Sequence, residues 1–108
     1  MIWAELPADL DTPVSIVLKL GQDRRFSALL ESVEGGATRG RYSFIALDPD
    51  LIWKCNGQTA EICRTVTAGA LSYTLDAKPT LDSLRALIAE SRIDLPDTLP
   101  PMSAGLIG

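Results

Sequence analysis

The length, composition and charge of this chain limit the classes of protein to which it can belong. With 108 residues, of which 46% are hydrophobic and 22% charged, it has the composition of a soluble globular domain with a modest core. A formal net charge of −4 argues against nucleic-acid and membrane partners, because nucleic acids and anionic membranes select basic surfaces. No apolar run approaches the roughly 20 residues that cross a bilayer, and the first residues do not form a signal peptide. We therefore expect a cytoplasmic protein.

Histidine and cysteine usage narrows the chemistry that is open to the chain. The sequence has no histidine, so it lacks the commonest general base near neutral pH and the commonest metal ligand. Its two cysteines, Cys55 and Cys63, are too few for a disulfide framework or a zinc site, and we expect free, packed thiols. No nucleophile–base pair or phosphate-binding glycine loop is visible. These features favour a binding or regulatory role, without a catalytic residue, metal or cofactor in this chain.

The first predicted elements are strands. The residue before Pro13 is pushed out of the helical region, and apolar residues alternate along the next segment, so we expect a strand at Val14–Leu20. After a turn, Phe26–Val33 is the second expected strand. On it Leu30 and Ser32 share one face, while Glu31 points to the other.

A third strand and a hairpin follow. A glycine-rich insert leads into the strand Tyr42–Leu47, and a turn separates it from the hairpin strands Leu51–Cys55 and Gln58–Arg64. The pair Asn56-Gly57 between them is the preferred two-residue loop of type I′. That loop sets the register of the hairpin.

The register predicts which side chains meet across the hairpin. It places Trp53 opposite Ala60, makes Lys54 and Glu61 diagonal neighbours, and puts Cys63 opposite Asp50, so that the two cysteines are not partners.

The last elements are a short strand and a helix. One more strand is expected near Leu71–Thr74. Thr80 has the residue type of a helix N-cap, and Asp82 in the first turn suits the helix dipole. The helix is expected at Leu81–Ser91, with an amphipathic stripe formed by Leu81, Leu84, Leu87 and Ile88. The fold class is therefore α+β, a mostly antiparallel sheet with one or two helices.

Four segments in this order resemble the N-terminal region of anthranilate synthase component I: Thr12–Ser15, Leu29–Gly36, Gly40–Ile45 and Pro100–Gly108. The resemblance is greater than to the related aminodeoxychorismate synthase component I, because the run Leu-Leu-Glu-Ser-Val-Glu-Gly-Gly is intact at residues 29–36. It implies that residues 1–108 are the N-terminal part of a larger two-layered fold, truncated before the chorismate-binding catalytic domain. The chain ends within an apolar, glycine-punctuated run, which also suggests a fragment.

The resemblance also implies a function. The full-length enzyme of this family is a lyase that makes anthranilate and pyruvate from chorismate and ammonia with Mg²⁺, in tryptophan biosynthesis. A glutamine amidotransferase subunit, component II, supplies the ammonia. The catalytic residues and metal carboxylates belong to the C-terminal half, so we expect this fragment alone to be inactive.

The family's feedback site for L-tryptophan gives the candidate site residues. Its Leu-Leu-Glu-Ser motif corresponds to Leu30, Glu31 and Ser32, and the second strand of that pocket to Tyr42 and Ser43. The resemblance implies that these residues form part of an allosteric tryptophan site, which the C-terminal half completes. An apolar wall with a few polar groups is what an amino-acid ligand requires.

Other functions and partners stay open at this point. The chain could be the corresponding region of aminodeoxychorismate synthase component I, or a structural module that only contacts the catalytic half or component II. It could also be an independent small binding domain that is complete at 108 residues. A strand edge left exposed in a fragment could pair with a second copy, giving a homodimer.

Overall fold

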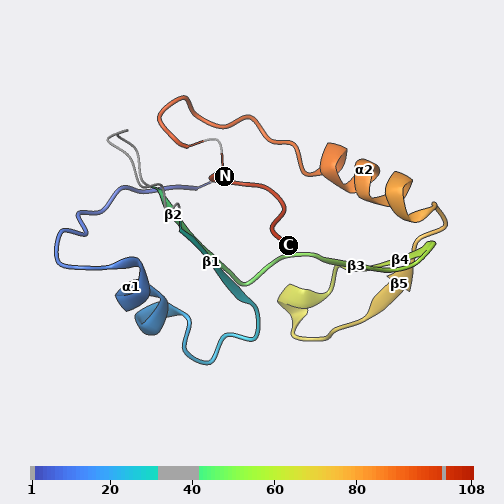
Figure 1. The fold of residues 1–108 in the computed structure, drawn as a ribbon, viewed down its shortest axis with the longest axis horizontal. Helices are drawn as coiled ribbons and strands as arrows, with labels where there is room; N and C mark the ends of the chain where they lie inside the picture. Colours follow the sequence, from blue (N-terminus) through green and yellow to red (C-terminus); the bar gives the residue numbers. More distant parts are fainter. Residues whose placement is uncertain (1, 32–41, 101) are drawn as a thin grey trace. The chain divides into compact units, whose positions relative to one another are not determined.

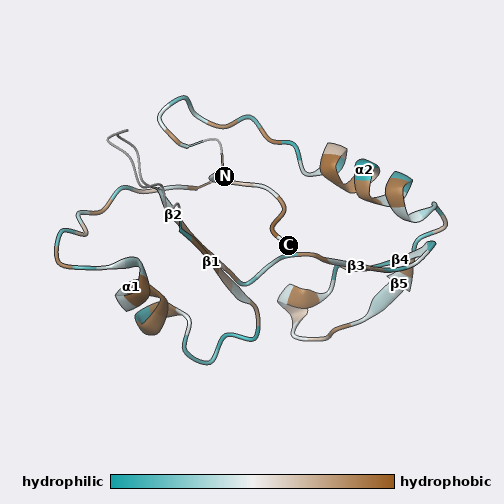
Figure 2. Ribbon diagram, viewed as in Figure 1, coloured by the Kyte–Doolittle hydropathy of each residue, from teal (hydrophilic) through white to brown (hydrophobic). Residues whose placement is uncertain are grey.

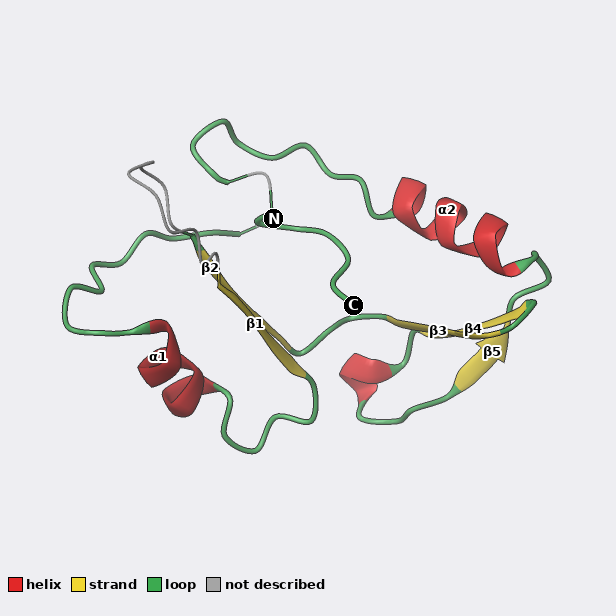
Figure 3. Ribbon diagram, viewed as in Figure 1, coloured by secondary structure: helices red, strands yellow, loops and turns green. Residues whose placement is uncertain are grey.

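The computed structural model describes residues 2–31, 42–100 and 102–108. This part of the chain contains two α-helices and two small antiparallel sheets, which confirms the α+β class (Figure 3). The chain divides into two compact units, Met1–Leu47 and Asp48–Gly108 (Figure 1). The assignment of residues 1–108 to one region of a larger fold stays a prediction. In the described ranges, no helix has the length and apolar character needed to cross a membrane.

Helix α1 covers Pro13–Leu20, where the alternation of apolar residues predicts a strand. That prediction is wrong because Thr12, although extended, is a helix N-cap. Its hydroxyl accepts a hydrogen bond from the Ser15 N–H at 3.1 Å, and the Ser15 hydroxyl accepts one from the Thr12 N–H at 2.9 Å. This capping box satisfies two backbone donors, and Pro13 suits the first helical position, where no N–H is needed. The apolar positions fit a helix as well as a strand, because Val14, Val17 and Leu18 have the i, i+3, i+4 spacing of one helix face, and here the cap decides for a helix.

Strands β1 (Ser27–Glu31) and β2 (Ser43–Leu47) form an antiparallel pair where two strands are predicted. The register places Glu31 opposite Ser43. Burial alternates along β1, with Leu30 half-buried and Glu31 exposed, which confirms their assignment to opposite faces. The sequence predicts that the strand containing β1 continues to residue 33, and residues 32 and 33 lie outside the described residues. Helix α1 contacts β2 within this first unit.

Helix α1 leaves much of its apolar surface exposed. Three of its apolar residues are at least half exposed: Val14, Leu18 and Leu20. Figure 2 shows hydrophobic residues over much of this helix. Exposed apolar groups that gather on one element are a common mark of a contact surface.

In the second unit, β3 (Ile52–Asn56) and β4 (Thr59–Cys63) form the predicted hairpin with a register that differs by two residues. Trp53 lies opposite Ile62, and the loop consists of residues 57–58 instead of 56–57. Within this loop only Gly57 has a positive φ, 61°, which fits a type II′ turn, whereas type I′ needs positive φ at both loop positions. The predicted register is therefore wrong. Because the shift is an even number of residues, every side chain keeps its predicted face.

The corrected register changes several side-chain pairs. Lys54 lies directly opposite Glu61, where a diagonal pair is predicted, and the two side chains form an ion pair at 3.2 Å. Cys63 pairs with Ile52 instead of Asp50. Both cysteines are free as expected, but only Cys63 is buried, and the prediction of a packed thiol is wrong for the exposed Cys55.

Strand β5 (Tyr73–Leu75) completes the second sheet, whose order is β3-β4-β5. It pairs antiparallel with β4 and overlaps the strand predicted near Leu71–Thr74. A 3₁₀ turn at Val66–Ala68, which the sequence did not predict, follows β4 and ends at Gly69 with a φ of 79°.

Helix α2 covers Thr80–Glu90, as expected within one residue at each end, and contacts β4. Thr80 is not the N-cap. Pro79 occupies that position, and the Thr80 hydroxyl instead donates to the Gly57 carbonyl at 2.8 Å. The buried face is also rotated from the predicted stripe. Leu87 is 3% exposed and Ser83 1%, whereas Leu81 and Ile88 are 64% and 46% exposed.

Candidate functional site

The strand ends of the first unit bring most of the predicted site residues together. Leu30 and Glu31 end β1, and Ser43 begins β2 directly opposite Glu31. Tyr42 immediately precedes Ser43. Ser32, the fifth predicted residue, lies outside the described residues. The geometry thus groups four of the predicted side chains at one end of a two-stranded sheet.

The two faces of this strand end differ in chemistry. Leu30 lies opposite Phe44, and the Phe44 and Tyr42 rings are 6.1 Å apart with a tilt of 34°, so this face is apolar and partly aromatic. Glu31 and Ser43 are both exposed on neighbouring strands and supply a carboxylate and a hydroxyl. The first face can contact a ring and the second an ammonium group, and a single ligand at this strand end reaches both faces only through the backbone.

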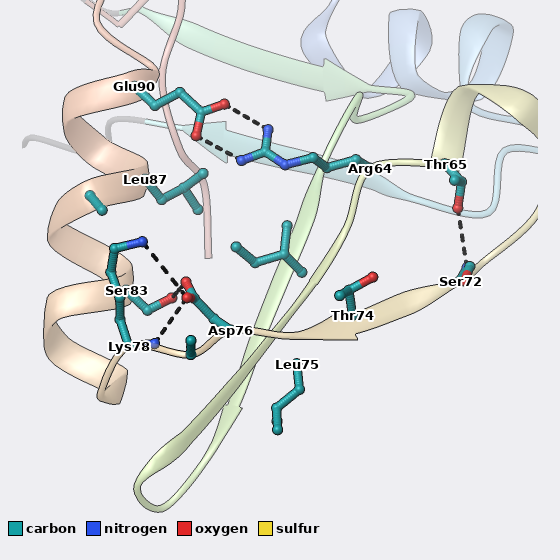
Figure 4. A pocket seen from close by; sticks show the side chains of 13 residues that line it. Arg64, Thr65, Ser72, Thr74, Leu75, Asp76, Lys78, Ser83, Leu87 and Glu90 are labelled. Carbon is teal, nitrogen blue, oxygen red and sulfur yellow. Dashed lines mark hydrogen bonds and ion pairs between the residues drawn. The ribbon is translucent and has the colours of Figure 1, made fainter.

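A groove in the second unit is a second candidate that the sequence did not predict. It has a volume of about 410 Å³ and lies between α2 and the face of β4 and β5 that carries Ile62 and Thr74 (Figure 4). Leu87 and Ala86 of α2 also line it.

A hydrogen-bonded chain from Trp53 through Ser83 to Asp76 ties this groove together. The Trp53 indole N–H donates to the Ser83 oxygen at 3.0 Å, and the Ser83 hydroxyl donates to Asp76 Oδ2 at 2.7 Å. The backbone N–H of Lys78 donates to Asp76 Oδ1 at 3.0 Å. Since the Ser83 and Lys78 bonds stabilise the charged carboxylate, the pKa of Asp76 lies below its usual value. These hydrogen bonds connect β3, the segment that follows β5, and α2.

An ion pair closes the other end of the groove. Arg64 donates two hydrogen bonds to the two carboxylate oxygens of Glu90, at 2.6 and 2.7 Å. These bonds lower the pKa of Glu90 and raise the pKa of Arg64. Both groups therefore stay charged near neutral pH, and neither is suited to transfer a proton there.

One signal in the sequence could have pointed to this groove. Ser83 lies among apolar residues of α2, one position before Leu84 and four before Leu87. A polar residue on the buried face of a helix needs a hydrogen-bond partner from another element. The identity of that partner was not readable, because Trp53 and Asp76 are distant in sequence.

Residues 2–31, 42–100 and 102–108 hold no group of three or more Asp, Glu, Cys or His side chains that could bind a metal ion.

The described residues form an α+β protein with two candidate sites, a strand end in the first unit and a groove in the second. Over its whole length, the chain is 51% identical to anthranilate synthase component 1 of Cereibacter sphaeroides, of which it covers 22%. It is 38% identical to the Synechocystis protein of the same name and 32% identical to that of Aquifex aeolicus, with 99% of the chain matched in each case. No family model matches the chain, and no solved structure matches it significantly.

The chain thus belongs to the anthranilate synthase component 1 family, as the sequence resemblance indicated. It spans about a fifth of the length of the curated relatives that it matches.

Proposed function

We propose that this chain is the N-terminal, tryptophan-sensing part of an anthranilate synthase component I. The observation that carries the proposal is the register of β1 and β2, which groups Leu30, Glu31, Tyr42 and Ser43 in a protein of this family. In this proposal the apolar face with Leu30 contacts the indole ring. The ammonium group of L-tryptophan donates to the backbone carbonyl of Glu31, because the Glu31 side chain points to the opposite face of the strand.

Ser32 is the principal residue of the proposed site. It follows Glu31 directly and completes the Leu-Leu-Glu-Ser motif on which the resemblance rests. We propose that its hydroxyl hydrogen-bonds the ligand and that the rest of the pocket comes from the longer protein. A half-site of this kind gives the isolated 108-residue chain little or no affinity for tryptophan.

The proposed activity belongs to the longer protein. It forms anthranilate and pyruvate from chorismate and ammonia in the cytoplasm, as part of tryptophan biosynthesis, and requires Mg²⁺ held outside the residues described here. Component II, a glutamine amidotransferase, is the proposed partner that delivers ammonia. The 108-residue chain alone is proposed to be inactive, because the resemblance assigns the catalytic residues and metal carboxylates to the C-terminal half of the longer protein.

A subunit-contact module is the second candidate function. The exposed apolar side chains of α1 favour it, since Val14, Leu18 and Leu20 are available to a partner surface. Among the described strands, β1 and β2 pair only with each other, so their outer edges are open to a second copy. The role of an aminodeoxychorismate synthase component I is less favoured, since the relatives described above are all anthranilate synthase component 1 proteins.

Inhibition assays on the full-length protein test the proposal. Ser32→Phe is expected to abolish inhibition by tryptophan while basal anthranilate formation persists. Ser27→Phe is the matched control, because Ser27 is an exposed serine at the opposite end of β1. Equal tryptophan inhibition in the wild-type and Ser32→Phe proteins would remove the proposed role of Ser32 and favour the contact module.

A further inference from the structure

The carboxylate oxygens that line the groove beside α2 accept hydrogen bonds from other groups of the protein. Both oxygens of Asp76 accept hydrogen bonds, one from the Ser83 hydroxyl at 2.7 Å and one from the Lys78 backbone at 3.0 Å. Both oxygens of Glu90 accept hydrogen bonds from Arg64. Each of these carboxylate oxygens thus already accepts one hydrogen bond from the protein, and a ligand cation would have to compete with those donors.

The groove's donors are far less engaged. The Lys78 Nζ lies 3.8 Å from Asp76 Oδ1, which is too long for a hydrogen bond, and among the described residues its ammonium group donates none. Arg64 uses two of its five N–H groups on Glu90. The hydroxyls of Ser72 and Thr74 line the groove and likewise make no hydrogen bond to another described residue. Lys78 is thus the charged group of this groove whose side chain makes no hydrogen bond to a described residue, which favours an anionic ligand.

The floor of the same groove is apolar. Ile62 of β4 and Leu87 of α2 line it, together with Ala86, and Leu87 is almost fully buried. Figure 4 shows Lys78 beside Ser83 and Asp76 at one end of the groove, and Arg64 with Glu90 at the other. A volume of about 410 Å³ is within the range of small-molecule sites. An apolar floor next to unspent donors suits an anion with an organic body better than an inorganic one.

We propose that this groove binds a small organic carboxylate, with the carboxylate on Lys78 and the neighbouring hydroxyls and the apolar body against Ile62 and Leu87. The site lies wholly in the second unit and is independent of the tryptophan site proposed in the first. Lys78 is more than half exposed, so solvent and salt screen its charge and binding is weak. A Kd of roughly 1–10 mM is expected for a simple probe at low salt.

Titration of the ¹⁵N-labelled 108-residue chain with sodium benzoate tests this site. We expect saturable amide shifts confined to segments 62–65, 72–78 and 83–90, with a Kd that Lys78→Met or Lys78→Gln raises about threefold. Lys54→Met is the matched control, because Lys54 is a lysine of comparable exposure that pairs with Glu61 on the opposite face of the same sheet. Its Kd should equal that of the wild type. The dispersion of the amide spectrum verifies that each variant is folded.

Three results would overturn the proposal. Shifts that rise linearly to about 50 mM benzoate would show that no site exists, and equal affinity in the Lys78 variants and the wild type would remove the role of Lys78. A glutamate-rich peptide that shifts the same amides at least about tenfold more tightly than benzoate would identify the groove as a docking site for an acidic polypeptide segment instead. Phenylalanine methyl ester, a cationic ring compound, should bind more weakly than benzoate.

Discussion

Removal of the Ser83 hydroxyl is the sharpest test of how α2 is held on its sheet. Ser83 is 1% exposed, accepts from the Trp53 indole at 3.0 Å and donates to Asp76 at 2.7 Å. Ser83→Ala leaves the indole N–H without its acceptor, and an unsatisfied donor of this kind costs about 1–3 kcal/mol. Solvent reaches part of the site, so we expect the free energy of unfolding to fall by about 2 kcal/mol.

Urea unfolding measures this loss. The Trp3→Phe substitution is made in every protein, so that the fluorescence comes from Trp53 alone. Ser72→Ala is the matched control, because the Ser72 hydroxyl makes no hydrogen bond to another described residue and its removal should cost less than about 0.5 kcal/mol. Ser83→Thr keeps the hydroxyl and should recover part of the stability. A loss in Ser83→Ala no larger than that in Ser72→Ala would refute the view that this hydroxyl connects the helix to the sheet.

Three further perturbations have defined outcomes. Leu87→Ala should lower the free energy of unfolding by about 2–4 kcal/mol, because Leu87 is 3% exposed, whereas Leu81→Ala at a 64% exposed position should cost less than about 1 kcal/mol in the same urea titration. The pKa of Asp76 is lowered in the folded state, so its stabilising contribution is complete above the unfolded pKa near 3.8 and disappears as the pH falls through the folded value; acid titration of Asp76→Asn should lack this loss. Thr12→Ala removes half of the capping box and should destabilise α1 by about 1 kcal/mol, measured as faster amide exchange in α1 with no change in α2.

The parts of the fold that short-range patterns determine were predictable. The alternation that placed Leu30 and Glu31 on opposite faces holds in β1, and the period of apolar residues located α2 to within one residue at each end. Both patterns follow from backbone geometry, which depends on neighbouring residues alone.

Other features depended on which of two local solutions the chain adopts. Thr12-Pro13 is compatible with the start of a strand and with a helix N-cap, and the reciprocal bonds with Ser15 select the helix. Asn56-Gly57 suits a type I′ loop, but the observed loop begins at Gly57, which shifts the pairing by two residues. Such choices are made by a few hydrogen bonds that composition does not reveal.

The groove depended on contacts between distant residues. Thr80 has the right type for an N-cap, yet its hydroxyl bonds to the Gly57 carbonyl from another element. The buried face of α2 is rotated toward Ser83 for a related reason, since Ser83 meets Trp53 and Asp76. Sequence spacing could not supply these partners. The tryptophan site residues, by contrast, were named from family resemblance, and their role stays a prediction.

Calorimetric titration of L-tryptophan into the full-length protein and its Ser32→Phe variant is the most direct test of the central claim. If this chain senses tryptophan, the wild-type protein binds tryptophan and is inhibited by it, the Ser27→Phe control behaves alike, and Ser32→Phe does neither while it still forms anthranilate. Tryptophan binding and inhibition that are the same in the wild-type and Ser32→Phe proteins would contradict the claim.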